Sequence, residues 1–471
     1  MERFIGRKRE LATLERLYET DGFQMLVMYG RRRVGKSTLL QHFAAGKRCV
    51  YYMAIRSGAQ RNLELLGECV IEALAPDLHG ARFGSYEELF VFLAKQCVEK
   101  RLLFVIDELP YLVEQEPALL SILQKAIDLS WSSGRMMLVL CGSSVSFMEN
   151  AVLSEKSPLY GRRSMQMCVQ PFSYREAAAF VPSYTHEEQA ICYGITGGIA
   201  KYLALFDDRR PLVENLMDVF FDPSGYLYEE PSNLLTQEFR NIATYSAVIE
   251  AVASGRTKLS EIADLTHLDA STVAHAAGNL IATGIVKKSF AITEERNKKK
   301  IRYTLADHMF RFWYRFLPKG MAAVEAGHGA GYFDYAVRPL LSDYMGAVFE
   351  DMCRAYTLGQ GLSGALGGMY TRVGAWWGTN PARREETDID VVALDDVLHT
   401  ALLGECKYRN EPLDTSVLDR LQTRDGLIDA HYRTAGWLLF SKNGFTEGVR
   451  AKAKEQHIVA VTLDEMYAAG E

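Results

Sequence analysis

One junction in the sequence constrains the fold more than any other. Residues 24–29, QMLVMY, form an apolar strand-like run, and GRRRVGKST follows at once. The residues that match the spacing G-x-x-x-x-G-K-[ST] without a gap are Gly30, Gly35, Lys36 and Ser37. Glycines at these positions let backbone N–H groups point at phosphate oxygens, and the following helix adds its positive N-terminal end. A strand before the motif and a helix after it indicate a phosphate-binding loop rather than a chance glycine-rich turn.

The side chains of this loop predict ATP and Mg²⁺ as cofactors. Lys36 is expected to reach the β- and γ-phosphates, and the Ser37 hydroxyl is expected to ligate Mg²⁺. The other candidate nucleotide-binding residues of the loop, three of which add positive charge, are Arg31, Arg32, Arg33, Val34 and Thr38.

Two later apolar runs end in polar residues. The run LLFVIDEL at 102–109 ends in an acidic pair, of which Asp107 is expected to hold Mg²⁺ through water and Glu108 to polarise the attacking water. A buried strand with a polar end is the alternative, but the position after a phosphate-binding loop favours the catalytic interpretation. The run MMLVLCGSS at 136–144 makes Ser143 a candidate sensor of the nucleotide. With further strands expected at 49–53 and 165–170, the pattern predicts a parallel sheet with alternating helices.

Several other stretches resemble known ATPases. The opening FIGRKRELATL resembles the F-x-G-R-x-x-E-L box of AAA-like and STAND-class ATPases, which implies that Phe4, Gly6 and Arg7 lie against the adenine. SPLYGRR, QPFSYREA and ITGGIAKYL are similar to the archaeal-type ATPase family, a STAND-class group. Relatives usually have proline where Ala200 stands, which puts the sensing role of that turn in doubt. Arg162 or Arg163 is either an arginine finger or an ordinary surface arginine.

The middle of the chain resembles a winged helix-turn-helix. KLSEIADLTHLDASTVAHAAGNLIATGIVKK has a helix, a short turn and a second helix over 270–280, capped by Asp269. VKKSFAI and IRYTLAD are expected to form the two strands of a wing, whose basic residues are Lys287, Lys288, Arg296, Lys298, Lys299, Lys300 and Arg302. The second helix offers no Arg or Lys to read guanine, so weak, sequence-tolerant DNA binding through phosphates is expected. The alternative is a module that packs against the ATPase and relays its state.

The C-terminal stretch TDIDVVALDDVLHTALLGECKYR predicts a β-hairpin with a chemical face. In an antiparallel register that pairs Leu394 with Ala401, the facing polar pairs are Asp390 with Glu405 and Asp388 with Lys407. Side chains alternate between faces along a strand, so these four share one face. Two facing carboxylates repel each other unless a cation such as Mg²⁺ lies between them.

With a strand at 372–378 and an upstream helix that carries Glu350, this hairpin resembles the PD-(D/E)XK nuclease core of restriction-endonuclease-like domains. The resemblance implies that Asp390 and Glu405 bind the metal, helped by the Cys406 carbonyl. It also implies that Lys407 activates the water and that Glu350 supports the site, which together give a Mg²⁺-dependent DNA endonuclease. The alternatives are a solvated hairpin face of mixed charge and a nuclease fold kept only for binding.

These features predict a multidomain α/β protein of 471 residues. The expected parts are a P-loop ATPase core at 1–204, a helical lid at 205–245, the winged helix-turn-helix and a connecting helix at 246–318, a linker at 319–334, and a nuclease-like domain at 335–471.

The composition restricts the partners. A formal net charge of −6 argues against nucleic acid bound along the whole chain, so any DNA contact is expected to be local. The charged N-terminus and the short apolar runs predict a cytoplasmic protein without a membrane partner. We therefore expect an ATP-binding and ATP-hydrolysing switch that acts on DNA through its C-terminal domain and forms a nucleotide-dependent homo-oligomer. The alternative is an ATP-dependent regulatory switch that binds a partner or DNA without cleavage.

Overall fold

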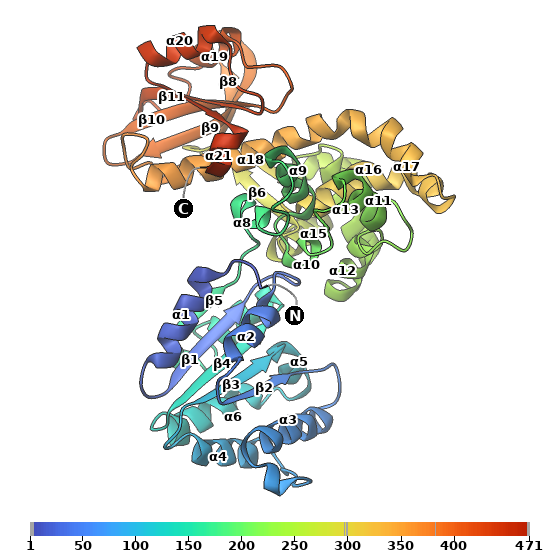
Figure 1. Ribbon diagram of the computed structural model, residues 1–471, viewed down its shortest axis with the longest axis vertical. Helices are drawn as coiled ribbons and strands as arrows, with labels where there is room; N and C mark the ends of the chain where they lie inside the picture. The colour runs from blue at the N-terminus through green and yellow to red at the C-terminus, as the bar shows by residue number, and fades with distance from the viewer. Residues whose placement is uncertain (1–3, 296, 298–299, 382, 469–471) are drawn as a thin grey trace. The chain divides into compact units, whose positions relative to one another are not determined.

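The chain divides into two compact units, whose elements are labelled in Figure 1. The computed structural model describes residues 4–295, 297, 300–381 and 383–468. The first unit comprises Met1–Phe172 and Ile199–Lys201, and the second comprises Ser173–Gly198 and Tyr202–Glu471. The expected end of the ATPase core at 204 therefore differs from the structural boundary. Helices of 173–198 pack within the second unit, where the Tyr174 hydroxyl donates to the Met466 carbonyl.

The first unit is built on a parallel five-stranded sheet in the order β2-β3-β4-β1-β5. The five strands, all predicted from the sequence, are β1 (Gln24–Tyr29), β2 (Cys49–Met53), β3 (Leu102–Asp107), β4 (Met136–Gly142) and β5 (Met165–Cys168). Their predominantly apolar sequences fit a sheet that is covered on both faces. Because all strands run in one direction, their C-terminal ends meet at one edge, and the candidate polar residues follow there.

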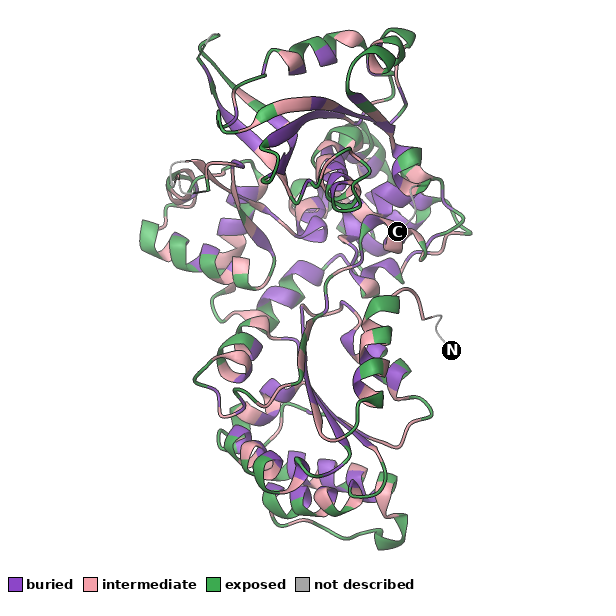
Figure 2. Cartoon of the chain, turned by 90° about the vertical axis from the view of Figure 1, so that its left-hand side faces the viewer, coloured by how far each residue is buried: buried purple, intermediate pink, exposed green. Residues whose placement is uncertain are grey.

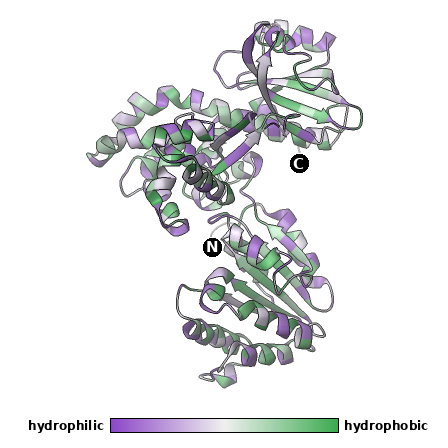
Figure 3. Ribbon diagram, turned by 180° about the vertical axis from the view of Figure 1, so that it is seen from behind, coloured by the Kyte–Doolittle hydropathy of each residue, from purple (hydrophilic) through white to green (hydrophobic). Residues whose placement is uncertain are grey.

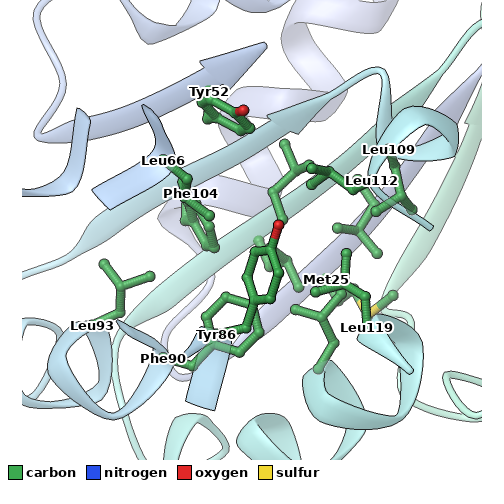
Figure 4. Packing of buried hydrophobic residues seen from close by; sticks show 14 of the residues in the cluster. Met25, Tyr52, Leu66, Tyr86, Phe90, Leu93, Phe104, Leu109, Leu112 and Leu119 are labelled. Atoms are coloured by element: carbon green, nitrogen blue, oxygen red, sulfur yellow. The ribbon is translucent and has the colours of Figure 1, made fainter. Parts of the chain in front are cut away.

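Helices cover this sheet and bury a continuous core. The helices of the first unit are α1 (Lys8–Glu19), α2 (Lys36–Ala44), α3 (Ala59–Leu74), α4 (Tyr86–Gln96), α5 (Leu109–Gln115), α6 (Leu119–Ala126) and α7 (Val145–Phe147). Met25 and Phe104 of the sheet pack with Leu66 of α3 and Phe90 of α4 in one cluster, shown in Figure 4. Trp131 is fully buried in the same cluster and donates its indole N–H to the Phe90 carbonyl at 3.0 Å. The central strands β1, β3 and β4 are correspondingly buried, as Figure 2 shows, whereas β5 at the edge is partly exposed.

The second unit begins with helices and a small wing. The helices are α8 (Tyr174–Ala178), α9 (His186–Thr196), α11 (Leu212–Phe220), α12 (Glu230–Glu238), α13 (Ile242–Ala253), α14 (Leu259–Thr266) and α15 (Ala270–Ala282), while α10 (Ala200–Leu203) crosses the boundary between the units. The Asp269 side chain caps α15 by accepting from the Thr272 N–H, as predicted. β6 (Val286–Phe290) and β7 (Ile301–Leu305) pair antiparallel and form the predicted wing.

Residues 319–334, which the sequence predicts to be a linker, are largely helical. α16 (His308–Glu325) runs through the first half of this stretch, and α17 (Gly329–Tyr332) follows. Glycine and alanine indicate a linker only where nothing packs against them. Gly320 is buried, and a Cβ built there would lie 2.1 Å from the Tyr332 ring, so the small residue admits a close helix contact.

A mixed five-stranded sheet closes the second unit, in the order β12-β11-β10-β9-β8. Its elements are α18 (Leu341–Leu362), β8 (Arg372–Asn380), β9 (Glu385–Asp395), β10 (Thr400–Lys407), α19 (Thr415–Gln422), β11 (Arg433–Ser441), α20 (Glu447–Glu455), β12 (Ile458–Thr462) and α21 (Leu463–Ala468). β8, β9 and β10 pair antiparallel, and β11 and β12 continue parallel to β10. Leu394 faces Ala401, which confirms the predicted hairpin register.

Hydropathy follows this layering, with apolar residues concentrated in the strands of Figure 3. Within the described part of the chain, no helix is both long enough and apolar enough to cross a membrane.

Candidate functional site

The phosphate-binding loop lies between β1 and α2, as its spacing predicts. Gly30 has φ 146°, and a Cβ built there would lie 2.4 Å from the Val169 carbonyl oxygen, so only glycine fits. Helix α2 begins at Lys36, with Gly35 at its N-cap. The buried Lys36 ammonium donates to the carbonyls of Gly30 and Arg31 at 2.8 and 2.9 Å. Burial lowers the pKa of Lys36, and the nearby carboxylates of the site oppose that shift.

The predicted Mg²⁺ pair is in direct contact. Ser37 Oγ donates to Asp107 Oδ2 at 2.6 Å, across the ends of α2 and β3. Tyr51, in the middle of β2, donates its hydroxyl to the same oxygen at 2.7 Å. Burial and the Asp107 charge raise the pKa of Tyr51, so this phenol remains a donor. No sequence pattern selects Tyr51, because an aromatic residue in an apolar strand is normally part of the core.

Glu108 and Ser143 lie together at the neighbouring strand ends. Glu108 adopts a left-handed conformation with φ 56°, which turns the chain from β3 into α5. Its Oε2 accepts the Ser143 hydroxyl at 2.9 Å and the Ser143 N–H at 3.3 Å. The predicted sensor residue therefore holds the predicted water-polarising carboxylate.

The N-terminal box lies against the loop. Arg7 donates to the Val34 carbonyl at 2.9 Å, and its guanidinium lies 3.9 Å from the centre of the Phe172 ring. Phe4 stacks on His42 of α2 with 4.0 Å between ring centres. This arrangement brings together the box and the loop, which are separated in the sequence.

The ITGGIAKYL turn also reaches the loop. The Lys201 N–H donates to the Arg33 carbonyl at 3.2 Å, and a Cβ built on Gly35 would lie 3.5 Å from Ala200. Ala200, where the sequence resemblance leads us to expect proline, therefore lies beside the phosphate-binding loop.

The two arginine-finger candidates, Arg162 and Arg163, contact segments other than the phosphate-binding loop. Arg162 makes a two-bond ion pair with Asp128, with both N–O distances 2.7 Å. Arg163 donates to the Leu153 carbonyl at 2.9 Å. Arg32 approaches the Tyr111 hydroxyl of α5 at 3.3 Å. These contacts could not be read from the sequence because they depend on helix placement.

The C-terminal hairpin gathers the predicted carboxylates. The paired ladder of β9 and β10 ends at Val391 and Gly404, and one further step places Asp390 beside Glu405. Asp390 Oδ2 accepts the Cys406 N–H at 2.9 Å. Burial, together with the negative charges of Glu405 and Glu350, raises the pKa of Asp390 to about 7. Burial also raises the pKa of Glu350 on α18, so three predicted acidic residues share one electrostatic environment.

Two cations already contact Glu405. Lys407 Nζ lies 2.7 Å from Oε1, and the guanidinium of Arg424, just beyond α19, is bonded to Oε2. The Glu405 and Arg424 side chains are 7% and 10% exposed, so this ion pair is buried. Arg424 was not found from the sequence, because it lies 17 residues beyond Lys407 in a segment without a motif.

The donor set fits a hard cation held by few protein ligands. Among residues 4–295, 297, 300–381 and 383–468, no group of three or more His, Cys, Asp or Glu side chains could hold a metal ion. Two carboxylates, Asp390 and Glu405, with the Cys406 carbonyl are oxygen ligands of the kind that Mg²⁺ prefers, and Mg²⁺ usually keeps several waters. Burial first, and then the negative charges of Glu405 and Glu350, raise the pKa of Asp390, and a cation bound there would favour its ionised form.

Some basic residues of the wing, for which the sequence predicts phosphate contact, lie against other protein groups. Lys287 Nζ lies 3.0 Å from Asp351 of α18, and the Arg302 guanidinium lies 4.4 Å from the centre of the Trp377 ring. The Lys300 carbonyl accepts the Trp377 indole N–H at 3.2 Å. Lys288 is exposed, while Arg296, Lys298 and Lys299 lie outside the described residues. The wing therefore packs against the C-terminal sheet, where Ile292 joins the buried cluster that contains Trp376 and Trp377.

Two family models match parts of the chain. Residues 4–206 match a model described as an ATPase domain predominantly from Archaea. Residues 313–422 match one described as archaeal and bacterial proteins of unknown function. Together with the loop geometry, the first match identifies an ATPase-type P-loop domain.

Other known proteins are similar to this chain in sequence or in structure over most of its length. An uncharacterized protein of Methanocaldococcus jannaschii is 29% identical over 408 residues, which cover 86% of this chain and 88% of that protein. A solved Walker-type ATPase of Pyrococcus abyssi is 20% identical, with a TM-score of 0.49 over 66% of this chain and 96% of that chain. The ORC2 protein of Aeropyrum pernix, solved as ADPNP–ADP complexes, is 14% identical, with a TM-score of 0.47 over 69% of this chain and 97% of that chain.

Proposed function

We propose that this protein is an ATP-hydrolysing switch that acts on DNA through a metal-dependent, nuclease-like C-terminal domain. The observation that carries the nucleotide half is the convergence of the P-loop with the acidic pair at the end of β3, Asp107 and Glu108. The Ser37 hydroxyl donates to Asp107 at 2.6 Å, and Glu108 is the next residue along the chain. This combination of a cationic loop, a metal-binding pair and a nearby carboxylate suits phosphoryl transfer to water.

Each residue of the ATPase site then has a defined task. Bound ATP with Mg²⁺ supplies the phosphates and the phosphoryl group that is transferred. Lys36 leaves the carbonyls of Gly30 and Arg31 and neutralises phosphate charge. Ser37 and Asp107 orient the metal. Ser143 bonds Oε2 of Glu108, so it holds in place the carboxylate that orients the attacking water.

The C-terminal centre supports the nuclease half of the proposal. A bound divalent cation supplies a water of lowered pKa. Asp390 and Glu405 hold that cation with the Cys406 carbonyl, and Glu350 supports them from α18. Lys407, whose Nζ lies 2.7 Å from Glu405 Oε1, would orient that water for attack on a DNA phosphodiester.

One observation favours a second candidate, a regulatory switch that binds DNA or a partner without cleavage. Both oxygens of Glu405 are engaged by Arg424 and Lys407. An ion pair of this kind satisfies the carboxylate without metal, so the same fold can serve as a binding module.

Cleavage separates the two candidates. Linear, circular and single-stranded DNA are incubated with Mg²⁺ or Mn²⁺, with and without ATP, and products are resolved on gels. The nuclease proposal expects metal-dependent products that Lys407→Ala and Asp390→Ala abolish, the second with loss of metal binding. Lys452→Ala, an exposed-face control on α20 that pairs with Asp419, should leave cleavage unchanged. Intact DNA under every condition, together with DNA retention that weakens as salt rises, would favour the binding module.

A further inference from the structure

The wing is connected to the carboxylate centre by charged side chains. Lys287 of β6 lies 3.0 Å from Asp351 Oδ1, and the same oxygen accepts from Arg354 Nη2 at 2.8 Å. Arg354 Nη1 donates to the Asp390 carbonyl at 2.7 Å and lies 3.4 Å from Glu350 Oε2. The path therefore runs from the wing through α18 to the main chain of a proposed metal ligand.

The wing cannot shift independently of the sheet, because it shares the core of that sheet. The Ile292 N–H donates to the Ala375 carbonyl of β8 at 2.9 Å. Ile292 also belongs to the same buried cluster as Trp376, Trp377 and Ile389. Lys287 is thus held at a fixed place opposite Asp351 by apolar burial as well as by charge.

Charge balance explains why Lys287 matters to Arg354. Burial alone would raise the pKa of Asp351, but Lys287, Arg354 and Arg311 lower it, so this carboxylate stays ionised. While Lys287 supplies part of the compensating charge, one guanidinium nitrogen of Arg354 remains directed at Asp390. Without Lys287, Asp351 draws more strongly on Arg354, which then bonds Asp390 and Glu350 less well.

We propose that Lys287 and Asp351 are positioning residues that orient Arg354 on the Asp390 main chain, so that the wing forms part of the metal-dependent centre. This inference rests on the proposed nuclease function. It gives the β6–β7 wing a task other than phosphate contact. Through Asp351 and Arg354, Lys287 of the wing would set the position of Asp390, a proposed metal ligand. Loss of the Lys287 charge would then weaken metal binding at a site that Lys287 does not touch directly.

Replacement of adjacent lysines in the full-length chain tests the proposal. Mn²⁺ binding is measured by calorimetry without DNA for wild type, Lys287→Met and Lys288→Met. Lys287→Met should bind Mn²⁺ about three- to tenfold more weakly, a range typical of residues that act through a connecting network. Lys288→Met is the matched control, since Lys288 is exposed on the same strand, and its Mn²⁺ affinity should equal that of wild type.

Two further variants separate positioning from simple loss of stability. Lys287→Arg can still pair with Asp351, so it should recover most of the Mn²⁺ affinity. In an Asp351→Asn background, Lys287→Met should cause no additional loss of affinity, because Lys287 acts through that carboxylate. Melting temperatures are recorded for every variant, and affinity is measured only well below them.

The outcomes distinguish this inference from the proposed function. Equal Mn²⁺ affinity in wild type and Lys287→Met overturns the inference alone, even if the melting temperature falls. Additive losses in the Asp351→Asn background also overturn it. A wild-type protein that binds no Mn²⁺ overturns the proposed nuclease function and this inference together.

Discussion

Replacement of Arg424 by methionine should destabilise the second unit strongly and make its stability depend on metal. The side chains of Arg424 and Glu405 are 10% and 7% exposed, so removal of the guanidinium leaves a buried carboxylate with one partner fewer. Breaking such a pair typically costs about 3–5 kcal/mol. Lys407 remains 2.7 Å from Glu405, so we expect a loss near about 3 kcal/mol, the low end of that range. For a unit of this size, that loss lowers the melting temperature by roughly 5 °C.

A divalent cation should restore much of this loss. Mn²⁺ at about 100 times its dissociation constant stabilises a folded site by about 2.7 kcal/mol. In wild type, Mn²⁺ must displace the guanidinium from Glu405, so it should raise the melting temperature less than in Arg424→Met. Differential scanning calorimetry with EDTA or Mn²⁺ measures both effects.

Arg420→Met is the matched control, because Arg420 lies exposed on α19, close to Arg424 in the sequence. It should melt near the wild-type temperature with and without Mn²⁺. The reasoning is refuted if Arg424→Met melts like Arg420→Met, or if Mn²⁺ stabilises wild type as much as Arg424→Met.

Three other outcomes are expected. Lys36→Ala should abolish ATP binding in calorimetry, because a buried ammonium within the loop is lost, and unchanged affinity would contradict that role. Glu108→Gln should bind ATP but hydrolyse it at least tenfold more slowly in a phosphate-release assay, since an amide is a poor base for water; equal turnover would assign the water to another residue. Burial lowers the pKa of His308 to about 4, below its ordinary value near 6.5. The unfolded state therefore binds the proton first. The stability that neutral His308 contributes is present above pH 6.5 and is lost as pH falls toward 4, by about 2 kcal/mol between pH 8 and pH 5. In urea unfolding, the free energy of unfolding of His308→Gln should fall less between pH 8 and pH 5 than that of wild type. An equal fall in both proteins would contradict the burial argument.

Local sequence patterns were sufficient to predict the features that are built from consecutive residues. The strand at 24–29 and the glycines after it predicted the P-loop, because a phosphate cradle is made from consecutive backbone groups. The five strands of the first sheet were predicted because each is an apolar run of ordinary strand length. The hairpin register was predicted from alternation alone, since a slip by one residue would expose the apolar face.

Other parts of the interpretation depended on contacts between distant segments. The basic wing was expected to face phosphates, yet Lys287 and Arg302 face α18 and Trp377. Charge composition does not distinguish a cation that awaits a ligand from one that already has a protein partner. The 319–334 stretch was expected to be a linker for a similar reason, since its small residues permit either flexibility or close helix packing.

The sequence by itself determined the nucleotide loop, the acidic strand ends and the carboxylates of the C-terminal hairpin, because each depends on spacing within one or two elements. Only the tertiary structure decided which partners those groups receive. Tyr51 reaches Asp107 across adjacent strands, Arg424 reaches Glu405 from beyond α19, and Arg354 reaches Asp390 from α18. These side chains come together because burial of the two sheets fixes where their helices and strand ends lie, and that information is distributed over the whole core rather than written in any motif.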